Sequence, residues 1–152
     1  MAFQPISNSV PSALQVSVSV QSPIEGKMML ALMENKKFTI VKDGDSPEGE
    51  GFFVMPQKTL GPYRADFIIK AVGYPLGKRV WPPKKKVYIA VECDGAEFHT
   101  SPEQKSKDRE RDKHFSSKGI KTFRFTGSEI HQNSSLIARD LASHLENEVW
   151  KS

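Results

Sequence analysis

The most informative part of this 152-residue chain reads Val87-Tyr-Ile-Ala-Val-Glu-Cys-Asp-Gly-Ala-Glu-Phe-His99. Its first five residues are apolar or aromatic at every position, which predicts a strand that is covered on both faces. The strand then runs directly into Glu92, Cys93 and Asp94. Side chains two positions apart on a strand share a face, so the two carboxylates should lie about 7 Å apart on one side. Two like charges at the edge of a core are tolerated when a cation lies between them, and we interpret this as half of a metal site.

The composition limits the class of protein. The formal net charge is +4 and the pI is about 9.2, a mild basic excess that is compatible with a polyanionic partner. The single cysteine, Cys93, excludes an intrachain disulfide and favours a reducing compartment. The chain shows no apolar run near the roughly 18 residues of a membrane span, and no signal-like start. We therefore expect a cytoplasmic protein without a membrane partner, in which an N-terminal arm (1–20) precedes a single folded domain (21–150).

The residue patterns around the central strand predict the element order α-β-β-β-β-α-β-α. Ser22-Pro23-Ile24-Glu25 is typical of a helix start, with a serine cap, a proline in the first turn and a capping-box glutamate, and the helix should end near Asn35. Strands are expected at 37–42, 52–55, 63–72 and 120–125, in addition to the central one. The first two of these should form a hairpin, which begins a three-strand meander.

Two further helices complete the predicted fold. One should begin at Ser101-Pro102 and end near Lys118, where Gly119 follows. The last should be capped by Asn133 or Ser134. The strand–helix–strand crossover around the first of these helices implies a parallel pair, because antiparallel neighbours need no crossover. The sequence therefore predicts an α/β fold with a mixed central sheet flanked by helices.

Two aspartates outside the central strand are candidates for the same site. Asp66 falls inside the predicted strand 63–72, where aspartate is depleted. Asp108, Asp112 and Phe115 share one face of the helix that follows the central strand, with Gly119 just beyond its end. Because Phe115 should be buried, Asp108 is expected to point inward with it.

Taken together, these patterns resemble the PD-(D/E)XK, or restriction-endonuclease-like, superfamily. They look most like its very-short-patch-repair (Vsr-like) branch and the small relatives of that branch. The matching stretches are Ser22-x-x-Glu25, Gln57-x-x-x-Gly61-x-Tyr63-Arg-x-Asp66-Phe67, Ile89-x-Val-Glu92-x-Asp94-Gly95 with His99 shortly after, and Asp108-x-x-Arg111-Asp112-x-x-Phe115-x-x-x-Gly119-Ile-Lys-Thr-Phe-Arg124-Phe125. The resemblance covers roughly residues 20 to 148. It departs from the superfamily pattern at position 94, where Asp94 replaces the usual lysine; the Vsr-like branch also lacks that lysine and uses a nearby histidine.

The resemblance implies a single-domain DNA endonuclease that depends on Mg²⁺ (or Mn²⁺). Hydrolysis of a phosphodiester needs a hard cation with oxygen ligands, and carboxylates supply these. The implied metal ligands are Asp66, Glu92 and Asp94, with the carbonyl of Cys93 as a further oxygen. The implied supporting residues are His99 for proton transfer, Glu25 at the metal shell, and Asp108 to orient His99 or a water.

Most of these residues also have an ordinary structural explanation. A capping-box glutamate such as Glu25 needs no catalytic role. Asp66 fits the solvated face of an edge strand, and His99 fits an exposed loop. Asp108 fits a salt bridge with Arg109 or Arg111 on the helix surface, and Cys93 fits a small buried side chain.

A basic cluster precedes the central strand and consists of Lys78, Arg79, Trp81, Lys84, Lys85 and Lys86. Such residues grip backbone phosphates and stack on bases, although charge runs are more often solvated loops. The cluster connects the strands that carry Asp66 and Glu92, which favours DNA contact. Two rival functions stay open: a nuclease-fold protein that binds nucleic acid without cutting it, and a nuclease subunit of a larger DNA-processing complex. A protein partner or a homodimer is equally compatible with the sequence.

Overall fold

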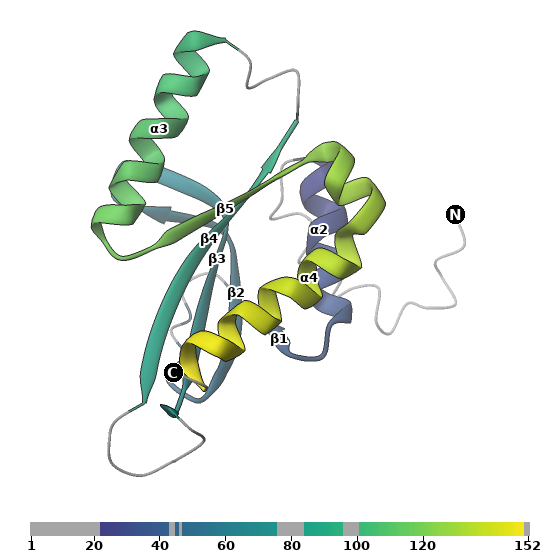
Figure 1. The fold of residues 1–152 in the computed structure, drawn as a ribbon, viewed down its shortest axis with the longest axis vertical. Helices are drawn as coiled ribbons and strands as arrows, with labels where there is room; N and C mark the ends of the chain where they lie inside the picture. The colour runs from purple at the N-terminus through teal and green to yellow at the C-terminus, as the bar shows by residue number, and fades with distance from the viewer. Residues whose placement is uncertain (1–21, 43–44, 46, 76–83, 96–100, 151–152) are drawn as a thin grey trace.

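The computed structural model describes residues 22–42, 45, 47–75, 84–95 and 101–150 and contains a five-stranded sheet with helices on both faces (Figure 1). The element order is the predicted one, and the α/β class is confirmed. The elements are α2 (Pro23–Glu34), β1 (Phe38–Ile40), β2 (Gly51–Leu60), β3 (Tyr63–Gly73), β4 (Lys85–Asp94), α3 (Pro102–Ser117), β5 (Lys121–Thr126) and α4 (Gly127–Val149). The arm predicted at 1–20 lies outside the described residues. In the part of the chain that is described, none of the helices combines the length and apolar character needed to cross a membrane.

The sheet is mixed and its strands lie in the order β1-β2-β3-β4-β5. β4 and β5 are parallel and joined through α3, as the crossover predicted, and β3 is antiparallel to both β2 and β4. The predicted hairpin of the first two strands is wrong, because β1 and β2 are parallel, with Phe38 beside Phe52. The connection 41–50 is longer than the two to five residues of a hairpin, so the chain can return to the end where β1 begins. The rings of Phe38 and Phe52 pack 5.9 Å apart, which stabilises this arrangement.

The predicted ends of the first two helices are confirmed. The Ser22 hydroxyl accepts a hydrogen bond from the Glu25 N–H at 3.2 Å, and α2 ends at Glu34. In α3 the Ser101 hydroxyl accepts from the Gln104 N–H at 3.1 Å. Gly119, just beyond its end, has φ +77°, a conformation that glycine adopts without steric cost.

α4 begins earlier than predicted. Thr126 and Glu129 form a capping box, in which the Thr126 hydroxyl accepts from the Glu129 N–H at 3.1 Å and the Glu129 carboxylate accepts from the Thr126 N–H at 2.8 Å. Asn133, one of the two predicted caps, instead has non-helical angles (φ −139°, ψ 29°) inside α4 and produces a kink. The sequence prediction therefore found the second segment of the helix and missed the first.

α2 and α4 cover one face of the sheet and α3 lies on the other (Figure 1), and an apolar cluster fills each of the two interfaces. The larger one packs α2 and α4 against one face and includes Leu32, Phe67 and Leu145. The smaller one lies under α3 and consists of Ala65, Ile68, Ala90, Phe115 and Ile120. Phe115 is the residue that anchors α3, since it is the one fully buried residue of that helix. Asp66 on β3 and the pair Glu92 and Asp94 on β4 lie beside α3.

The alternation of β3 is interrupted at Asp66. Ala65 belongs to the cluster under α3 and Phe67 to the opposite core, although residues two apart on a regular strand share a face. Gln57 lies across from Asp66 on β2, between the pairs Pro56–Phe67 and Lys58–Ala65. Its φ of +51° is uncommon for a residue with a side chain. Both strands are therefore irregular at the same point, next to the candidate site.

Candidate active site

Asp66 and Glu92 meet at the border of β3 and β4. The last regular pair of this antiparallel ladder is Phe67 with Val91, so the next position brings Asp66 opposite Glu92. Asp66 Oδ2 accepts a hydrogen bond from the Cys93 N–H at 2.7 Å. Asp94 lies two residues beyond Glu92 on β4, on the same face. The strand pairing thus puts Asp66 beside Glu92, and Asp94 lies further along the same face of β4.

Burial is the largest cause of the raised pKa values of Asp66 and Glu92. Burial raises the pKa of Asp66 to about 6, against a lowering by the Cys93 hydrogen bond and a further increase from the charge of Glu25. Burial and then the charge of Asp66 raise the pKa of Glu92 to about 8. Glu92 is only 2% exposed, and its Oε2 has no hydrogen-bond partner among the described residues. The two carboxylates therefore destabilise each other as anions unless positive charge is supplied.

Arg111 supplies part of that charge from α3. Its Nη2 lies 3.3 Å from Glu92 Oε1 and 3.4 Å from Asp108 Oδ1. Arg111 lies four residues before Phe115, which is the helical spacing that puts two side chains on one face, here the face against the sheet. From the sequence, Arg111 was expected only as a surface salt-bridge partner of Asp108, although its spacing from Phe115 was a usable signal that it faces the sheet.

Arg124, on β5, is a second arginine that brings positive charge to the acidic residues. It is the register partner of Glu92 in the parallel ladder, and its Nη1 lies 3.4 Å from both carboxylate oxygens of Asp94. Its Nη2 donates to Asp112 Oδ1 at 2.6 Å. Burial lowers the pKa of this guanidinium, but the hydrogen bond with Asp112 and the charge of Asp94 outweigh burial and raise the pKa above its ordinary value. Arg124 was also given no role by the sequence analysis.

Asp108 points toward the sheet as predicted and has a side chain that is 14% exposed. It accepts hydrogen bonds from Gln104 Nε2 at 3.2 Å and from Arg111 at 3.4 Å. The salt bridge with Arg111, one of the structural alternatives, is therefore present. His99, which Asp108 was predicted to orient, lies outside the described residues.

Glu25 connects α2 to the same region. It is 6% exposed, and its Oε1 accepts from Gln57 Nε2 at 2.5 Å. Its Oε2 accepts from the Ser22 hydroxyl at 3.3 Å. Gln57 lies across from Asp66, and the charge of Glu25 contributes to the raised pKa of Asp66. A capping residue on the surface would show neither feature, so Glu25 belongs to the acidic group by position.

The thiol of Cys93 is buried, and burial followed by the charge of Asp66 raises its pKa far above the ordinary value. It is therefore a neutral side chain that packs in the larger core. This leaves its backbone to interact with the site: the N–H binds Asp66, and the carbonyl stays the predicted metal ligand.

The described part of the basic cluster, Lys84 to Lys86, lies at the end of β4 that is far from the acidic residues. Lys85 pairs with Gly73, and Glu92 follows seven residues later, about 23 Å along β4 at 3.3 Å per residue. The connection therefore joins the ends of β3 and β4 that are farthest from Asp66 and Glu92. Lys84 Nζ donates to the Glu48 carbonyl at 2.5 Å, and Lys86 is exposed. Lys78, Arg79 and Trp81 lie outside the described residues, and DNA contact by the cluster stays a prediction.

The donor set suits a hard cation, although the acids are at present held by arginines. Among the described residues, no three His, Cys, Asp or Glu side chains lie close enough together to hold a metal ion. The Glu92 and Asp94 carboxylates instead contact Arg111 and Arg124. The buried Glu92 Oε2, which has no partner among the residues that the structure describes, and the raised pKa of Asp66 nevertheless mark a place where added positive charge would be stabilising. Carboxylate oxygens are the ligands that hard divalent cations prefer, so the chemistry of these side chains suits such a cation even though their present positions do not form a metal site.

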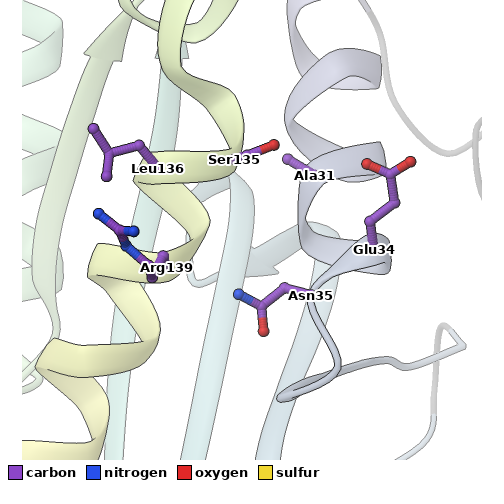
Figure 2. Close-up of a pocket in the computed structure, with 6 residues that line it drawn as sticks. All are labelled: Ala31, Glu34, Asn35, Ser135, Leu136 and Arg139. Atoms are coloured by element: carbon purple, nitrogen blue, oxygen red, sulfur yellow. The ribbon is translucent and has the colours of Figure 1, made fainter.

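A separate hollow of about 400 Å³ lies between α2 and α4 and takes no part in this site (Figure 2). Ser135 and Asn35 point into the gap from the two helices, while Leu136 points away from α2. Its other lining residues are Ala31, Glu34 and Arg139. None of the acidic residues of β3 and β4 reaches it, so it is distinct from the candidate active site.

The comparison with protein families agrees with the fold and the acidic site. The family REase_MTES_1575, a restriction-endonuclease-like family, matches residues 48–145, which is more than half of the chain and spans β2 to α4. The chain belongs to this family, and the family name indicates a nuclease. The match supports the PD-(D/E)XK superfamily and does not distinguish the Vsr-like branch. Glu25 lies outside the matched range. Neither the comparison with curated proteins nor that with solved structures found a match.

Proposed function

We propose that the protein is a metal-dependent DNA endonuclease that hydrolyses phosphodiester bonds. The observation that carries this proposal is the largely buried pair Asp66 and Glu92, which come from neighbouring strands. Within the described part of the chain, Glu92 Oε2 has no hydrogen-bond partner. The membership of a restriction-endonuclease-like family supports the same reaction class. The ligands of Mg²⁺ or Mn²⁺ would be Asp66, Glu92, Asp94 and the Cys93 carbonyl. A divalent cation held by these oxygens polarises the phosphoryl group and lowers the pKa of a nearby water.

The reaction requires two proton movements that the chain must manage. The oxygen of water forms a bond to phosphorus, and one phosphorus–oxygen bond of the diester breaks. The attacking water loses a proton, and the leaving oxygen gains one to become a hydroxyl group, so that charge and atoms balance. His99 is the predicted proton-transfer residue, because a histidine exchanges protons near pH 7.

Two residues support this arrangement indirectly. Glu25 is held by Gln57 across from Asp66, so it would fix one side of the acidic group or bind the cation through water. Asp108 would act through Arg111, which it contacts at 3.4 Å, in addition to the predicted role of orienting His99 or a water. The Vsr-like relationship stays a hypothesis that a close match to that branch would support.

Replacement of Asp66 by asparagine tests the proposal directly. Asp66→Asn keeps the size of the side chain and an oxygen for the Cys93 N–H, but removes the negative charge. We expect supercoiled plasmid to be nicked or cut by the wild type with Mg²⁺ or Mn²⁺, and the rate to fall by at least about 100-fold in the variant. Asp140→Asn, which changes an exposed aspartate of α4, is the matched control and should cut normally.

The outcome separates the enzyme from its main rival. Binding of several DNA forms without any cutting would instead indicate a non-cleaving binder on a nuclease fold. The absence of the usual lysine, which Asp94 replaces, is the feature that favours this rival. Cutting that survives in Asp66→Asn would contradict the proposed site. Cutting that needs an added protein fraction would point to a subunit of a larger complex.

A further inference from the structure

Two arginines contact the acidic group, and they differ in how completely their hydrogen-bonding groups are used. Arg124 contacts both oxygens of Asp94 and makes a short 2.6 Å bond to Asp112. Arg111 makes two longer contacts, both through Nη2, at 3.3 Å to Glu92 and 3.4 Å to Asp108. Its Nε is buried and has no hydrogen-bond partner among the described residues. Arg111 is therefore the incompletely satisfied cation of the site.

The edge of Arg111 formed by Nε and Nη2 is only partly used, because Nε has no hydrogen-bond partner among the described residues and Nη2 makes only the two long contacts. Nε and Nη2 together form one side of the guanidinium fork, which binds two oxygens of a phosphate in parallel. An unsatisfied buried donor is costly, so a ligand that accepts from Nε would be favoured. The Arg111 side chain as a whole is 19% exposed, whereas that of Glu92 is 3% exposed, so a ligand would approach Arg111 along its exposed part and reach the buried Nε from there.

The negative charge of the site also means that a cation is needed for a phosphate to bind there. Asp94 puts a carboxylate where the superfamily pattern has a lysine, so the site has gained an anion and lost a cation. A DNA phosphate brings further negative charge next to Asp66, Glu92 and Asp94. A guanidinium cannot act as a base at ordinary pH, so Arg111 can contribute only by binding and stabilising negative charge.

We propose that Arg111 binds a non-bridging oxygen of the phosphodiester that is cut and stabilises the charge that develops there during hydrolysis. This inference rests on the proposed endonuclease function and names a residue beyond the acidic group and His99. Arg111 takes part in no proton transfer and forms no covalent bond. The positive charge of Arg111 compensates for the lysine that is absent at position 94. Asp108 holds the Arg111 side chain in position.

The test uses Arg111→Met and Arg111→Lys, with Arg109→Met as the matched control, since Arg109 is an exposed arginine on the same helix. After the wild-type cleavage position is mapped, single-turnover rates are measured with the protein in saturating excess over DNA. We expect Arg111→Met to cut about 100-fold to 1,000-fold more slowly, as for the loss of one group that stabilises developing charge. Arg111→Lys should also lose at least about tenfold, because it keeps the charge but lacks the fork. Arg109→Met should remain near wild type.

A second readout measures the contact without cleavage. DNA affinity is measured by fluorescence anisotropy in Ca²⁺ at fixed salt, with a natural oligonucleotide and with one that carries a neutral methylphosphonate at the scissile position. The wild type and Arg109→Met should bind the neutral DNA more weakly than the natural DNA, whereas Arg111→Met should show a clearly smaller difference between the two. Circular dichroism establishes that each variant is folded, and Arg111→Lys serves if Arg111→Met is not.

Each result bears on a separate claim. If neutralising the phosphate weakens Arg111→Met by the same factor as the wild type, Arg111 does not touch that phosphate and the inference is wrong. The inference is equally wrong if Arg111→Met cuts as fast as Arg109→Met. If the wild type cuts no DNA, the proposed endonuclease function itself fails, and the role of Arg111 fails with it.

Discussion

The Cys93 N–H donates a 2.7 Å hydrogen bond to Asp66 Oδ2, which joins the acidic residue of β3 to the backbone of β4 between Glu92 and Asp94. This bond holds an ionised Asp66 side chain in the position where it raises the pKa of Glu92. The strand pairing brings the two acids opposite each other, and the hydrogen bond keeps one of them turned toward the neighbouring strand. The acidic group is therefore a product of backbone pairing as much as of side-chain chemistry.

The metal-free protein should lose stability as the pH rises through the range of these two pKa values. Because the folded pKa of Glu92 is about 8 against an ordinary 4.5, the folded state keeps a proton that the unfolded chain has released. This contribution is present in full below about pH 4 and is lost as the pH rises to 8, with a slope of up to about 1.4 kcal/mol per pH unit. Urea unfolding between pH 5 and 8 should show a shallower dependence in Glu92→Gln than in the wild type. Glu110→Gln, an exposed change on α3, should keep the wild-type slope, and an equal slope in Glu92→Gln would refute the explanation.

Mg²⁺ or Mn²⁺ should stabilise the folded protein, and more so at higher pH. A cation that binds only the folded state at 100 times its dissociation constant adds about 2.7 kcal/mol. The melting temperature of the wild type should therefore rise with metal concentration at pH 8 and less at pH 5.5, where the acids hold protons. Asp66→Asn should show little of this increase, whereas Asp140→Asn should match the wild type. A metal response that is unaffected by Asp66→Asn would place the cation elsewhere in the chain.

Weakening the cap of α4 should affect stability without affecting the site. Thr126 and Glu129 form a reciprocal pair of hydrogen bonds at the start of the helix. Thr126→Ala removes the side-chain acceptor and should lower the free energy of unfolding by about 1 kcal/mol, measured by urea titration. The rate of DNA cutting at a temperature where the variant is folded should stay at the wild-type level. A large loss of rate would mean that the end of β5 contributes to the site through Thr126.

Much of the fold could be predicted because its signals are local. Serine caps followed by proline fixed the starts of α2 and α3, and alternating apolar residues located β3 and β4. The parallel pairing of β1 with β2 could not be read in the same way, since it depends on how Phe38 and Phe52 pack with the rest of the core. The early start of α4 was visible as Thr126-x-x-Glu129, but the later Asn133 gave a competing signal.

The part of the candidate site that strand periodicity determines could be predicted from the sequence. Glu92 and Asp94 share a face because they are two residues apart, and Asp66 drew notice as a charge inside a strand. The contacts of Arg111 and Arg124 depend on how α3 and β5 lie against β4, which no local pattern specifies. Lysines 84–86 lie at the start of β4, whereas Glu92 lies near its end. The order of residues along the strand already implies this separation, which the expectation of DNA contact beside the acidic residues did not take into account.

Gln57 offers a test of the irregular backbone beside Asp66. Its φ of +51° is uncommon for a residue with a side chain, and its amide holds Glu25 at 2.5 Å. Gln57→Ala removes the hydrogen bond and keeps the strained conformation, while Gln57→Gly removes both. We therefore expect Gln57→Gly to be the more stable of the two variants, by about 1 kcal/mol in urea unfolding, although glycine normally destabilises a strand. Lys58→Gly against Lys58→Ala, one position further along β2, should show the usual reverse order. If alanine is the better residue at both positions, the backbone at Gln57 is not strained, and the irregularity of β2 and β3 would need another cause.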